Sequence, residues 1–501
     1  MFVHLIMSIL DAYTVLMDQV DLDKLKRINM RNINQIYING AFVTPHGSEI
    51  FDVINPTTEQ VIAKVTLADA IDTRLAVAAA KKAFPAFART TKDERVAILK
   101  RLHSAVLARA DALRDATIEE YGAPVSRASW ISHFSAQSFL DAAQTLESYD
   151  FTRLMGSSTV VMEPVGVAGL VTPWNSAAGS ICSKLAMALA AGCTSVIKPS
   201  EMSAIQNSIV SEAIHEAGLP PGVVNIVVGR GDVVGGELST NPDVAKISFT
   251  GSTTVGKIIQ HAATETMKRI SLALSGKSPT IILDDADLAQ AVPLALNAVF
   301  MNNGQACIAG SRLIVPARLL PEVIEIVKAV VSQMKVGNPA DQATVIGPLA
   351  NSNQFARVQH YIRLGIQEGA TLVAGGEGRP EGLEQGYFAK PTVFANVHSD
   401  MAIAREEIFG PVLSVLTYDC DEEAIEIAND TLYGLQAYVH SSNPARAKAV
   451  AVQLQAGRVL INCLLHDPLA PFGGFKQSGI GREYGLLGLE SYLEPKTLIG
   501  A

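Results

Sequence analysis

The sequence predicts an α/β fold, in which largely parallel sheets are covered by helices. From about residue 165 onward, short apolar runs alternate with helix-length segments, and sheets buried on both faces require strands of this kind. Alanine-rich segments with helical spacing precede these runs. At roughly 150 residues per domain, a chain of 501 residues with 48% hydrophobic content suggests about two to four domains with large cores.

The first third of the chain predicts strands followed by helices. Residues 1–33 are expected to form a helix ahead of the first domain, and Met30 is a candidate natural start. Residues 35–65 read as short strands, because residues 36–40 alternate in hydropathy and close with an Asn-Gly turn. Residues 67–146 carry apolar side chains at helical spacing and predict helices.

The remainder predicts two α/β units in succession. The first set of apolar runs covers residues 165–172, 194–198, 223–228 and 244–249. The second set starts at Thr280 and continues at residues 312–315, 412–416 and 459–461. We therefore expect a doubly wound nucleotide-binding sheet first and a second α/β domain after about residue 273.

Composition and charge exclude several classes of function. The 40 Lys and Arg against 49 Asp and Glu give a net charge of −9, which disfavours nucleic acid and anionic membranes as partners. The apolar run at residues 2–10 is too short to span a bilayer. The 5 cysteines include no CxxC pair and no Cys/His cluster, which argues against a disulfide scaffold or a metal site. We expect a cytoplasmic, reduced protein.

A glycine-rich turn follows the strand at residues 244–249. Residues 249–257 read FTGSTTVGK, and their backbone N–H groups can hold a phosphate at a helix start. The run nearly matches a P-loop, but Ile258 replaces the hydroxyl that would bind magnesium. A second run starts a GxGxxG pattern at Gly229 and Gly231, but its third glycine, Gly235, comes one place late. Taken alone, either run is more often an ordinary turn.

Three short motifs carry candidate chemistry. Residues 303–307 read NGQAC, where Cys307 is a candidate nucleophile, although most single cysteines are buried hydrophobes. A helix start or polar backbone neighbours would lower the pKa of this thiol. Asn175 ends the run TPWN and can donate to an oxyanion or cap the next helix. Lys198 and Glu201 in KPSE follow a strand, where they can bind ribose hydroxyls or form a solvated turn.

Together, six motifs in order resemble the NAD(P)-dependent aldehyde dehydrogenases, from about residue 35 to the C-terminus. They are TPWN (172–175), KPSE (198–201), FTGSTTVG (249–256), NNGQAC (302–307), EEIFGPV (406–412) and PFGGFKQSG (471–479). The resemblance implies a Rossmann-like NAD-binding domain plus an α/β catalytic domain and a small β oligomerisation element. The corresponding residues are 35–146 with 166–273, 274–480, and 147–165 with 484–501, after an N-terminal extension over 1–34. It also implies a homodimer or homotetramer.

The resemblance implies a catalytic cysteine. Cys307 would attack the aldehyde carbonyl, and the Asn175 amide with the Cys307 N–H would stabilise the oxyanion. Hydride loss would leave a thioester that water cleaves to the acid. Lys184 and Glu483 resemble proton-relay positions.

The same resemblance implies a set of cofactor residues. Lys198 and Glu201 would bind the adenosine ribose, Ser252 the pyrophosphate, and Glu407 the nicotinamide ribose. A carboxylate at position 201 would repel a 2′-phosphate, which favours NAD over NADP. The full set is Thr172, Pro173, Trp174, Lys198, Ser200, Glu201, Gly231, Phe249, Gly251, Ser252, Gly256, Leu274, Glu407 and Phe409.

One departure from the family pattern bears on the mechanism. Where the family usually reads LELGGKSP, this chain reads LALSGKSP over residues 272–279, so Ala273 replaces the general-base glutamate. Removing a positioned base costs roughly 10²- to 10⁴-fold in the step it serves. Three explanations stay open: another carboxylate, Glu483 first, activates the water; coenzyme A accepts the acyl group; or the base was removed or the activity lost.

The substrate end also departs from the family. Ser176, Ser180 and Ser183 replace positions that are often bulky and apolar, while the loop before PFGG carries His466, and Phe472 lies in that motif. Small hydroxyls widen a tunnel and favour a polar or hydroxylated aldehyde. The alternative is that these serines only pack against a helix. The rival functions are a CoA-acylating dehydrogenase and a non-catalytic NAD-binding protein.

Overall fold

The structure, a computed structural model, describes residues 30–500 of the chain. Most of the helix expected over residues 1–33 lies outside the described residues. Where the expected helix reaches into the described residues, the expectation is wrong. Arg31–Ile33 forms strand β1 and pairs in parallel with β5 (Val61–Thr66). The hairpin of β4 (Ile50–Ile54) with β5 leaves the other edge of β5 open, and β1 satisfies its backbone hydrogen bonds.

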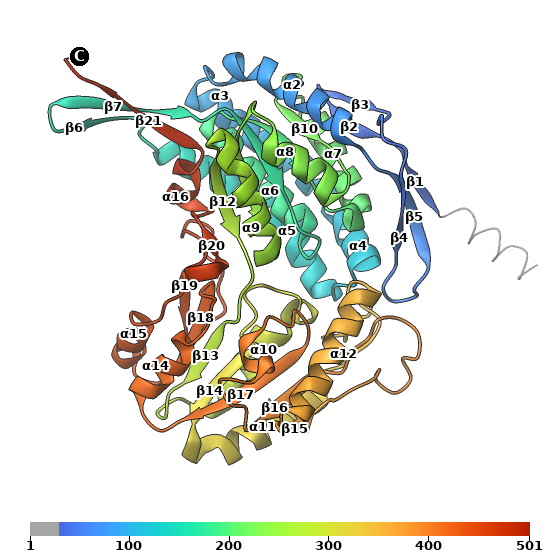
Figure 1. The fold of residues 1–501 in the computed structure, drawn as a ribbon, viewed down its shortest axis with the longest axis vertical. Coiled ribbons are helices and arrows are strands. Elements are labelled where there is room, and N and C mark those ends of the chain that lie inside the picture. Colours follow the sequence, from blue (N-terminus) through green and yellow to red (C-terminus); the bar gives the residue numbers. More distant parts are fainter. Residues whose placement is uncertain (1–29, 501) are drawn as a thin grey trace, which may run out of the picture.

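An eight-stranded sheet forms the first unit, in the order β20-β12-β11-β8-β9-β10-β2-β3 (Figure 1). Its central strands are parallel, and the antiparallel hairpin β2–β3 and the short β20 lie at its edges. The bounds are β20 (Gly479–Ile480), β12 (Arg269–Ala273), β11 (Val244–Thr250), β8 (Val167–Val171), β9 (Thr194–Lys198), β10 (Val224–Ile226), β2 (Ile36–Ile38) and β3 (Ala41–Val43). The four apolar runs predicted for this unit are confirmed as β8 to β11.

The order of this sheet reverses between β8 and β11. Crossovers from β8 run one way to β9 and β10, and the later strands β11 and β12 lie on the other side. The carboxyl ends of β8 and β11 therefore border a crevice, the usual place for a ligand in an open α/β sheet. TPWN follows β8 and the glycine-rich turn follows β11, so the topology brings these distant motifs together.

Helices cover both faces of the first sheet. One face packs against α2 (Ala70–Phe87), α8 (Gly236–Thr240) and α9 (Thr253–Ala263). The other packs against α3 (Lys92–Leu107), α5 (Val125–Ser148), α6 (Ala177–Ala191) and α7 (Ala204–Glu216), with α4 (Ala110–Tyr121) beside them. Helix α6 is alanine-rich and buried along nearly its whole length, which lets α5 pack closely against it.

The second unit contains a seven-stranded sheet in the order β15-β16-β17-β14-β13-β18-β19. All its pairs are parallel except β15 with β16. The bounds are β13 (Pro279–Ile282), β14 (Arg312–Pro316), β15 (Thr371–Ala374), β16 (Thr392–Ala395), β17 (Val412–Tyr418), β18 (Gln436–His440) and β19 (Arg458–Ile461). Helices α10 (Leu288–Phe300) and α11 (Leu320–Gln333) cover one face, and the other carries α12 (Ser352–Gln367), α13 (Ala402–Arg405), α14 (Asp421–Asn429) and α15 (Pro444–Ala451). The predicted α/β class is confirmed in both units.

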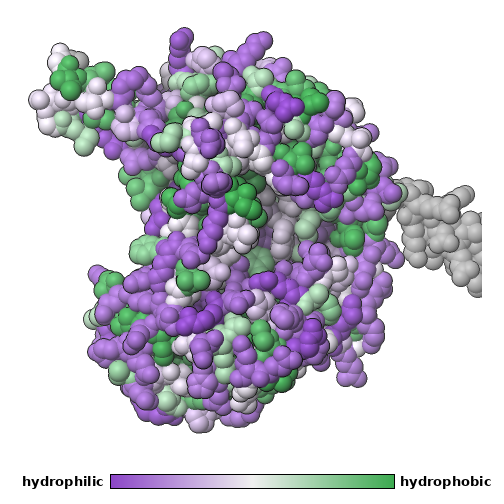
Figure 2. Space-filling view, in the orientation of Figure 1, coloured by the Kyte–Doolittle hydropathy of each residue, from purple (hydrophilic) through white to green (hydrophobic). Residues whose placement is uncertain are grey.

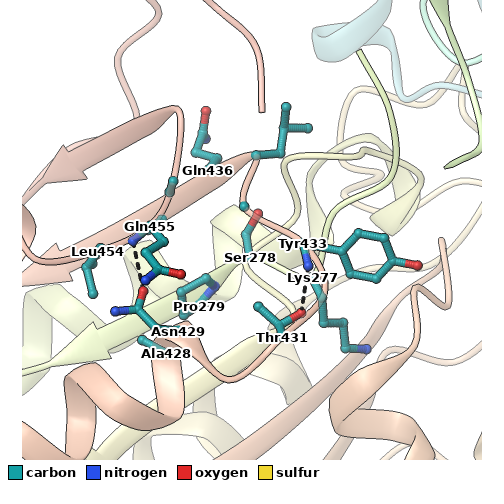
Figure 3. Close-up of a pocket in the computed structure, with 14 residues that line it drawn as sticks. Lys277, Ser278, Pro279, Ala428, Asn429, Thr431, Tyr433, Gln436, Leu454 and Gln455 are labelled. Atoms are coloured by element: carbon teal, nitrogen blue, oxygen red, sulfur yellow. Dashed lines mark hydrogen bonds between the residues drawn. The ribbon is translucent and has the colours of Figure 1, made fainter. Parts of the chain in front are cut away.

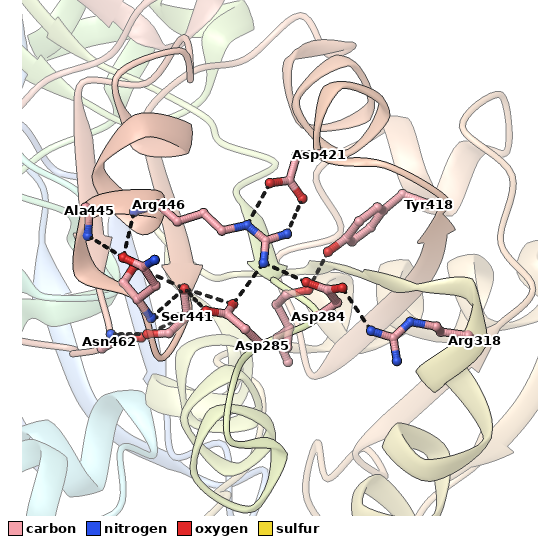
Figure 4. A network of polar contacts seen from close by, with 11 residues as sticks. Asp284, Asp285, Arg318, Tyr418, Asp421, Ser441, Ala445, Arg446 and Asn462 are labelled. Carbon is pink, nitrogen blue, oxygen red and sulfur yellow. Dashed lines mark hydrogen bonds and ion pairs between the residues drawn. The ribbon is translucent and has the colours of Figure 1, made fainter.

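An ion-pair network stabilises the carboxyl edge of the second sheet. Arg446 Nη2 lies 2.7 Å from Asp421 Oδ1, and its Nη1 lies 2.6 Å from Asp284 Oδ1 (Figure 4). Asp284 also binds Arg318 at 2.9 Å. These carboxylates raise the pKa of Arg446 above its usual value. The network connects the loop after β13 to the starts of α14 and α15, at the edge opposite the segment that carries Cys307.

A small antiparallel sheet projects from the first unit as an arm (Figure 1). It contains β6 (Thr152–Met155), β7 (Ser158–Pro164) and β21 (Leu493–Leu498), which follows the short helix α16 (Gly485–Glu490). Leu154 at its tip is 82% exposed. Figure 2, drawn in the orientation of Figure 1, shows a hollow between the two units.

Candidate active site

A cavity of about 650 Å³ lies where the two units meet. Its walls come from α5, the start of α6, the loop before β14, and the segment that leads from β19 to Glu483. Cys307, Asn175, Glu483 and all five residues predicted to contact substrate line it: Ser176, Ser180, Ser183, His466 and Phe472. The tertiary structure therefore gathers into one cavity residues that lie up to about 300 positions apart in the sequence.

Strained backbone, held by side-chain amides, shapes the loop before Cys307. Asn302 and Asn303 adopt φ values of 57° and 60°, in the left-handed region that non-glycine residues avoid. Asn303 Nδ2 donates to Gly122 O at 2.9 Å and to Pro348 O at 3.0 Å, while Gly347 N donates to Asn303 Oδ1. These bonds satisfy the buried amide and hold the loop in one conformation.

Cys307 lies in a turn and is half-buried where it lines the cavity. Gly276 packs against it, because a Cβ at position 276 would lie 2.1 Å from Cys307 O. A helix start would have lowered the pKa of this thiol, but burial, with a smaller contribution from the carboxylates of Glu407 and Glu483, raises it to about 12. The cysteine is not at a helix start, so no helix N-terminus offsets its desolvation.

The raised pKa predicts how Cys307 reacts with an alkylating reagent. In the protein without added cofactor, the rate of carbamidomethylation by iodoacetamide should rise about tenfold per pH unit between pH 7 and 10, because only the thiolate reacts. Mass spectrometry of the peptide that contains Cys307 measures this rate. The fully buried Cys182 and the exposed Cys420 are internal controls for unfolding and for reagent decay. A plateau below pH 8 would contradict the raised pKa.

Asn175 follows β8 and faces the same cavity. Its Nδ2 donates to Gln305 O at 2.9 Å, and Asn302 Nδ2 donates to Asn175 O at 3.2 Å. Ser176 stands at the N-cap of α6 and makes no side-chain cap bond, so the alternative role of Asn175 as a helix cap is excluded. Because an amide nitrogen carries two hydrogens, Asn175 keeps one donor for a group in the cavity.

Glu483 joins the cavity to a buried amine. It forms an ion pair with Lys184 on α6, whose Nζ also donates to Ser248 Oγ at 3.0 Å. The Lys184 side chain is 1% exposed and that of Glu483 is 14% exposed. Backbone bonds between Phe472 and Glu483, at 2.7 and 2.8 Å, hold the carboxylate in place. A proton can therefore pass between the cavity and the polar side chains behind it.

Ala273 ends β12 beside the cavity without contributing a polar atom. It pairs in register with Thr250 on β11, and Thr250 lines the cavity. Residues in register on parallel strands project from the same face of a sheet, so the Ala273 methyl group points to the cavity side. Glu483 and Asp141 are carboxylates of the cavity lining, while Glu407 lines a separate small pocket.

Glu407 lies close behind the loop that carries the cysteine. Its Oε1 accepts a hydrogen bond from Gly276 N at 3.0 Å. Burial raises the pKa of Glu407, and a hydrogen bond from the Ser275 hydroxyl opposes that rise. Ser275, which stands where the family usually has glycine, therefore gives the Glu407 carboxylate a hydrogen-bond donor.

A separate small cavity of about 10 Å³ borders Lys277 (Figure 3). Figure 3 shows the Lys277 side chain near Thr431 and Tyr433. Its amine is buried without a hydrogen-bond partner among residues 30–500, and burial lowers its pKa to about 7. A space of this size holds about one water molecule, so it is too small for a substrate.

The predicted cofactor residues divide into two groups. Lys198 is 5% exposed and pairs with Glu201 at 2.9 Å, which excludes a solvated turn. Ser252 caps α9 by accepting from Val255 N at 3.3 Å. Trp174 and Phe409 meet edge to face, with ring centroids 5.5 Å apart. Lys198, Ser200, Glu201, Thr172, Pro173, Trp174 and Ser252 all follow the carboxyl ends of β8, β9 and β11.

The remaining predicted cofactor residues have packing roles of their own. A Cβ at Gly256 would lie 2.6 Å from the Leu274 side chain, and one at Gly251 would lie 2.3 Å from the Phe249 ring. These glycines therefore permit close packing of α9 on the sheet. Gly231 starts a single turn over Gly231–Gly235, and its backbone is exposed with open space where a Cβ would stand.

Sequence reasoning missed one whole wall of the cavity. Five residues of α5 at spacings of three and four line it: Arg127, Trp130, Phe134, Gln137 and Asp141. This spacing was visible in the sequence, but it equally describes the buried face of any helix. Tyr484 and Arg458 were missed as well. Burial and the neighbouring Arg458 lower the pKa of His466 to about 4, so its imidazole is neutral at pH 7.

The described part of the chain offers neither a metal-binding cluster nor a membrane-spanning helix. Over residues 30–500, no group of three or more His, Cys, Asp or Glu side chains is placed to hold a metal ion. Within the same residues, no helix combines the length and the apolar character needed to cross a membrane.

Comparison with known proteins places this geometry in context. The sequence model of the Aldehyde dehydrogenase family matches residues 42–498. A 3-succinoylsemialdehyde-pyridine dehydrogenase from a Pseudomonas species is 46% identical over 473 residues, which cover 94% of this chain and 99% of that relative.

Solved structures share the same fold. A mutant of aldehyde dehydrogenase C from Pseudomonas syringae, in complex with NAD⁺ and octanal, aligns with a TM-score of 0.92 at 44% identity, covering 93% of this chain and 96% of that one. Betaine aldehyde dehydrogenase from Staphylococcus aureus, in complex with NAD⁺, aligns with a TM-score of 0.90 at 35% identity, covering 93% and 94%.

Proposed function

This chain belongs to the aldehyde dehydrogenase family, and from its site we propose that it oxidises an aldehyde to the carboxylic acid through a thioester on Cys307, with NAD⁺ as the oxidant. One observation carries the proposal: a nucleophile, an oxyanion donor and a carboxylate line a single cavity, at Cys307, Asn175 and Glu483. A protein that only binds a dinucleotide needs none of these three groups in that arrangement.

The residues divide the reaction between them. The Cys307 thiol loses its proton, which can pass toward Glu483 and the Lys184 amine, and Sγ forms a bond to the carbonyl carbon. The electron pair of the carbonyl bond moves to its oxygen, where Asn175 Nδ2 and the Cys307 N–H donate hydrogen bonds. When bound, NAD⁺ supplies the acceptor for the hydride that leaves this carbon. Water then adds to the thioester, the acid departs, and the thiol is restored.

The crevice at the sheet reversal fits a dinucleotide. Lys198 and Glu201 lie where a ribose binds in doubly wound sheets, and Ser252 lies at the N-terminus of α9, where N–H groups attract phosphate. Glu407, beside Gly276, would bind the nicotinamide ribose. We favour NAD over NADP, because the Glu201 carboxylate would accept ribose hydroxyls and repel a 2′-phosphate.

Glu483 is our candidate for the base that activates water. Position 273 holds alanine, whereas Glu483 lines the cavity with Cys307. Its carboxylate forms an ion pair with Lys184 behind the cavity wall. The alternatives are a thiol acceptor such as coenzyme A, and a chain in which hydrolysis has been lost.

The substrate end favours a polar aldehyde. Three serine hydroxyls, from Ser176, Ser180 and Ser183, lie on the cavity wall, and the neutral His466 ring adds a polar edge. Such groups offer hydrogen bonds to hydroxyl or carbonyl groups on the ligand. A steady rise of kcat/KM with alkyl chain length would contradict this preference.

The arm is our candidate for self-association into a homodimer or homotetramer. Strands β6 and β21 lie at the two edges of its sheet, and exposed strand edges pair readily with another chain. Leu154 and Met155 at its tip are 82% and 62% exposed.

Single-turnover kinetics tests the proposed function. Enzyme at high concentration, mixed with NAD⁺ and a panel of aldehydes, should give a burst of NADH of one equivalent per Cys307, followed by slower turnover. The burst is expected because acylation needs only the groups that are present, while hydrolysis lacks the family's usual base. Mass spectrometry of the quenched enzyme should find the acyl group on Cys307.

The same experiment separates the alternatives. If added coenzyme A speeds turnover, the acyl group is transferred to the thiol of coenzyme A and not to water. No NADH formation at all across the panel would remove the catalytic proposal and leave a protein that binds NAD alone. Turnover without a burst, at rates typical of the family, would show that hydrolysis is not slowed by Ala273.

A further inference from the structure

Arg127 is a half-buried cation of the cavity, and the described residues 30–500 supply it with no ion-pair partner. It lies on α5 and lines the same cavity as Cys307. Its guanidinium carbon is 4.1 Å from the centroid of the Trp130 ring. Its Nε is buried without a hydrogen-bond partner among residues 30–500, and within those residues its side chain forms no ion pair.

Two other arginines of this protein each donate several hydrogen bonds to backbone carbonyl oxygens. Arg312 donates to the carbonyl oxygens of Lys277, Ile427 and Ala428 at 2.8 to 3.0 Å. Arg458, which lines the cavity too, donates to three carbonyl oxygens of the loop before Phe472. An arginine retained in a desolvated site without such partners is costly unless a ligand completes its hydrogen bonds.

The acidic groups of the cavity are already committed elsewhere. Glu483 is paired with Lys184. Asp141 accepts a hydrogen bond from Gln137 Nε2 at 2.9 Å, and it lies 14 residues beyond Arg127 on α5, which corresponds to about 21 Å along the helix axis. Neither carboxylate offsets the charge of Arg127, so the wall near Trp130 attracts an anion.

We propose that the substrate carries a carboxylate in addition to its aldehyde, and that Arg127 binds this carboxylate while the carbonyl lies against Cys307. A guanidinium fork matches a carboxylate with two parallel hydrogen bonds. The parallel rings of Trp130 and Phe134, with centroids 4.9 Å apart, form an apolar wall for the chain between the two groups. This inference rests on the proposed function and narrows its substrate class to aldehyde acids.

The test compares charged and uncharged substrates in matched variants. We measure kcat/KM for a series of ω-oxo carboxylates with two to five methylene groups and for their methyl esters. The wild type should favour the best acid over its ester by about 20-fold or more, because a desolvated charge-assisted pair discriminates strongly. In Arg127→Gln, kcat/KM for the acid should fall about 30-fold, mainly through KM, and that for the ester less than threefold.

Two further variants serve as controls. Arg127→Lys keeps the charge but loses the fork, so it should recover part of the preference for the acid. Arg114→Gln removes an exposed arginine of α4 that pairs with Asp111 and Asp115, and it should change neither substrate series. The thermal unfolding midpoint and the ester activity of Arg127→Gln report whether that variant is folded.

The outcomes separate this inference from the proposed function. A burst of NADH with the esters, together with equal acid preference in the wild type and Arg127→Gln, would overturn the role of Arg127 and leave the dehydrogenase intact. A preference of the wild type for uncharged aldehydes would also overturn it. Absence of any NADH formation with every substrate would overturn the proposed function itself.

Discussion

Replacing Cys307 with alanine is expected to abolish NADH formation, with a loss of roughly 10⁵-fold or more, because no other group in the cavity can form the thioester. The change removes one sulfur atom from a half-buried side chain. The free energy of unfolding should therefore change by about 1 kcal/mol or less. Absorbance of NADH at saturating aldehyde measures the activity, and thermal unfolding measures stability.

A matched cysteine variant makes this result specific. Cys420 is exposed at the start of α14, in the second unit and outside the cavity. Cys420→Ala should retain activity within about twofold, as expected for a surface substitution. Residual activity above about 1% in Cys307→Ala, with the protein folded, would mean that the acyl group is carried by another residue or by none.

Replacing Ala273 with glutamate is expected to speed steady-state turnover by roughly 10²-fold or more, because it places a general base next to the thioester. Ala273 is in register with Thr250 on the cavity wall, so a longer side chain at position 273 extends toward the cavity. Pre-steady-state NADH kinetics would show the burst disappear as hydrolysis overtakes acylation. The rate of hydride transfer in the first turnover should stay within about threefold.

Two comparisons make the experiment at position 273 decisive. Ala273→Gln has nearly the same shape as Ala273→Glu but no proton acceptor, so it should not accelerate hydrolysis. Glu483→Gln in the natural background should slow hydrolysis by roughly 10²-fold, and Ala273→Glu should restore it. An unchanged rate in Ala273→Glu, in a folded protein that still shows the burst, would rule out a missing base as the limit on turnover.

The fold could be read from the sequence to a considerable extent. The runs that became β8 to β11 are largely apolar, since strands of a parallel sheet are buried on both faces, and this pattern is local. Strand β12 was missed because its run begins with the exposed Arg269, and β20 because it has only two residues. The family assignment, which rested on six ordered motifs, is confirmed by the match over residues 42–498.

Site residues that lie in short motifs could be predicted from the sequence, whereas site residues on the face of a long helix could not. Cys307, Asn175 and Glu483 were selected from their motifs, and the structure brings them to one cavity; their chemical roles stay predictions. Arg127 and Trp130 carry no motif, because a helical stripe of mixed residues is consistent with ordinary core packing. The strand Arg31–Ile33 forms through pairing with β5, which lies further along the chain. The local sequence does not show this pairing, so the segment was assigned to a helix.

The sequence by itself determined the residue types, the order in which the strands follow one another along the chain, and the alanine in place of a carboxylate at position 273. These depend on covalent connectivity and local pattern alone. The tertiary structure alone decided that burial raises the pKa of Cys307, that Glu483 is paired with Lys184 and that Arg127 Nε has no hydrogen-bond partner among residues 30–500. The physical reason is that desolvation and Coulomb energies depend on distances between side chains that are remote in the chain, and only packing fixes those distances.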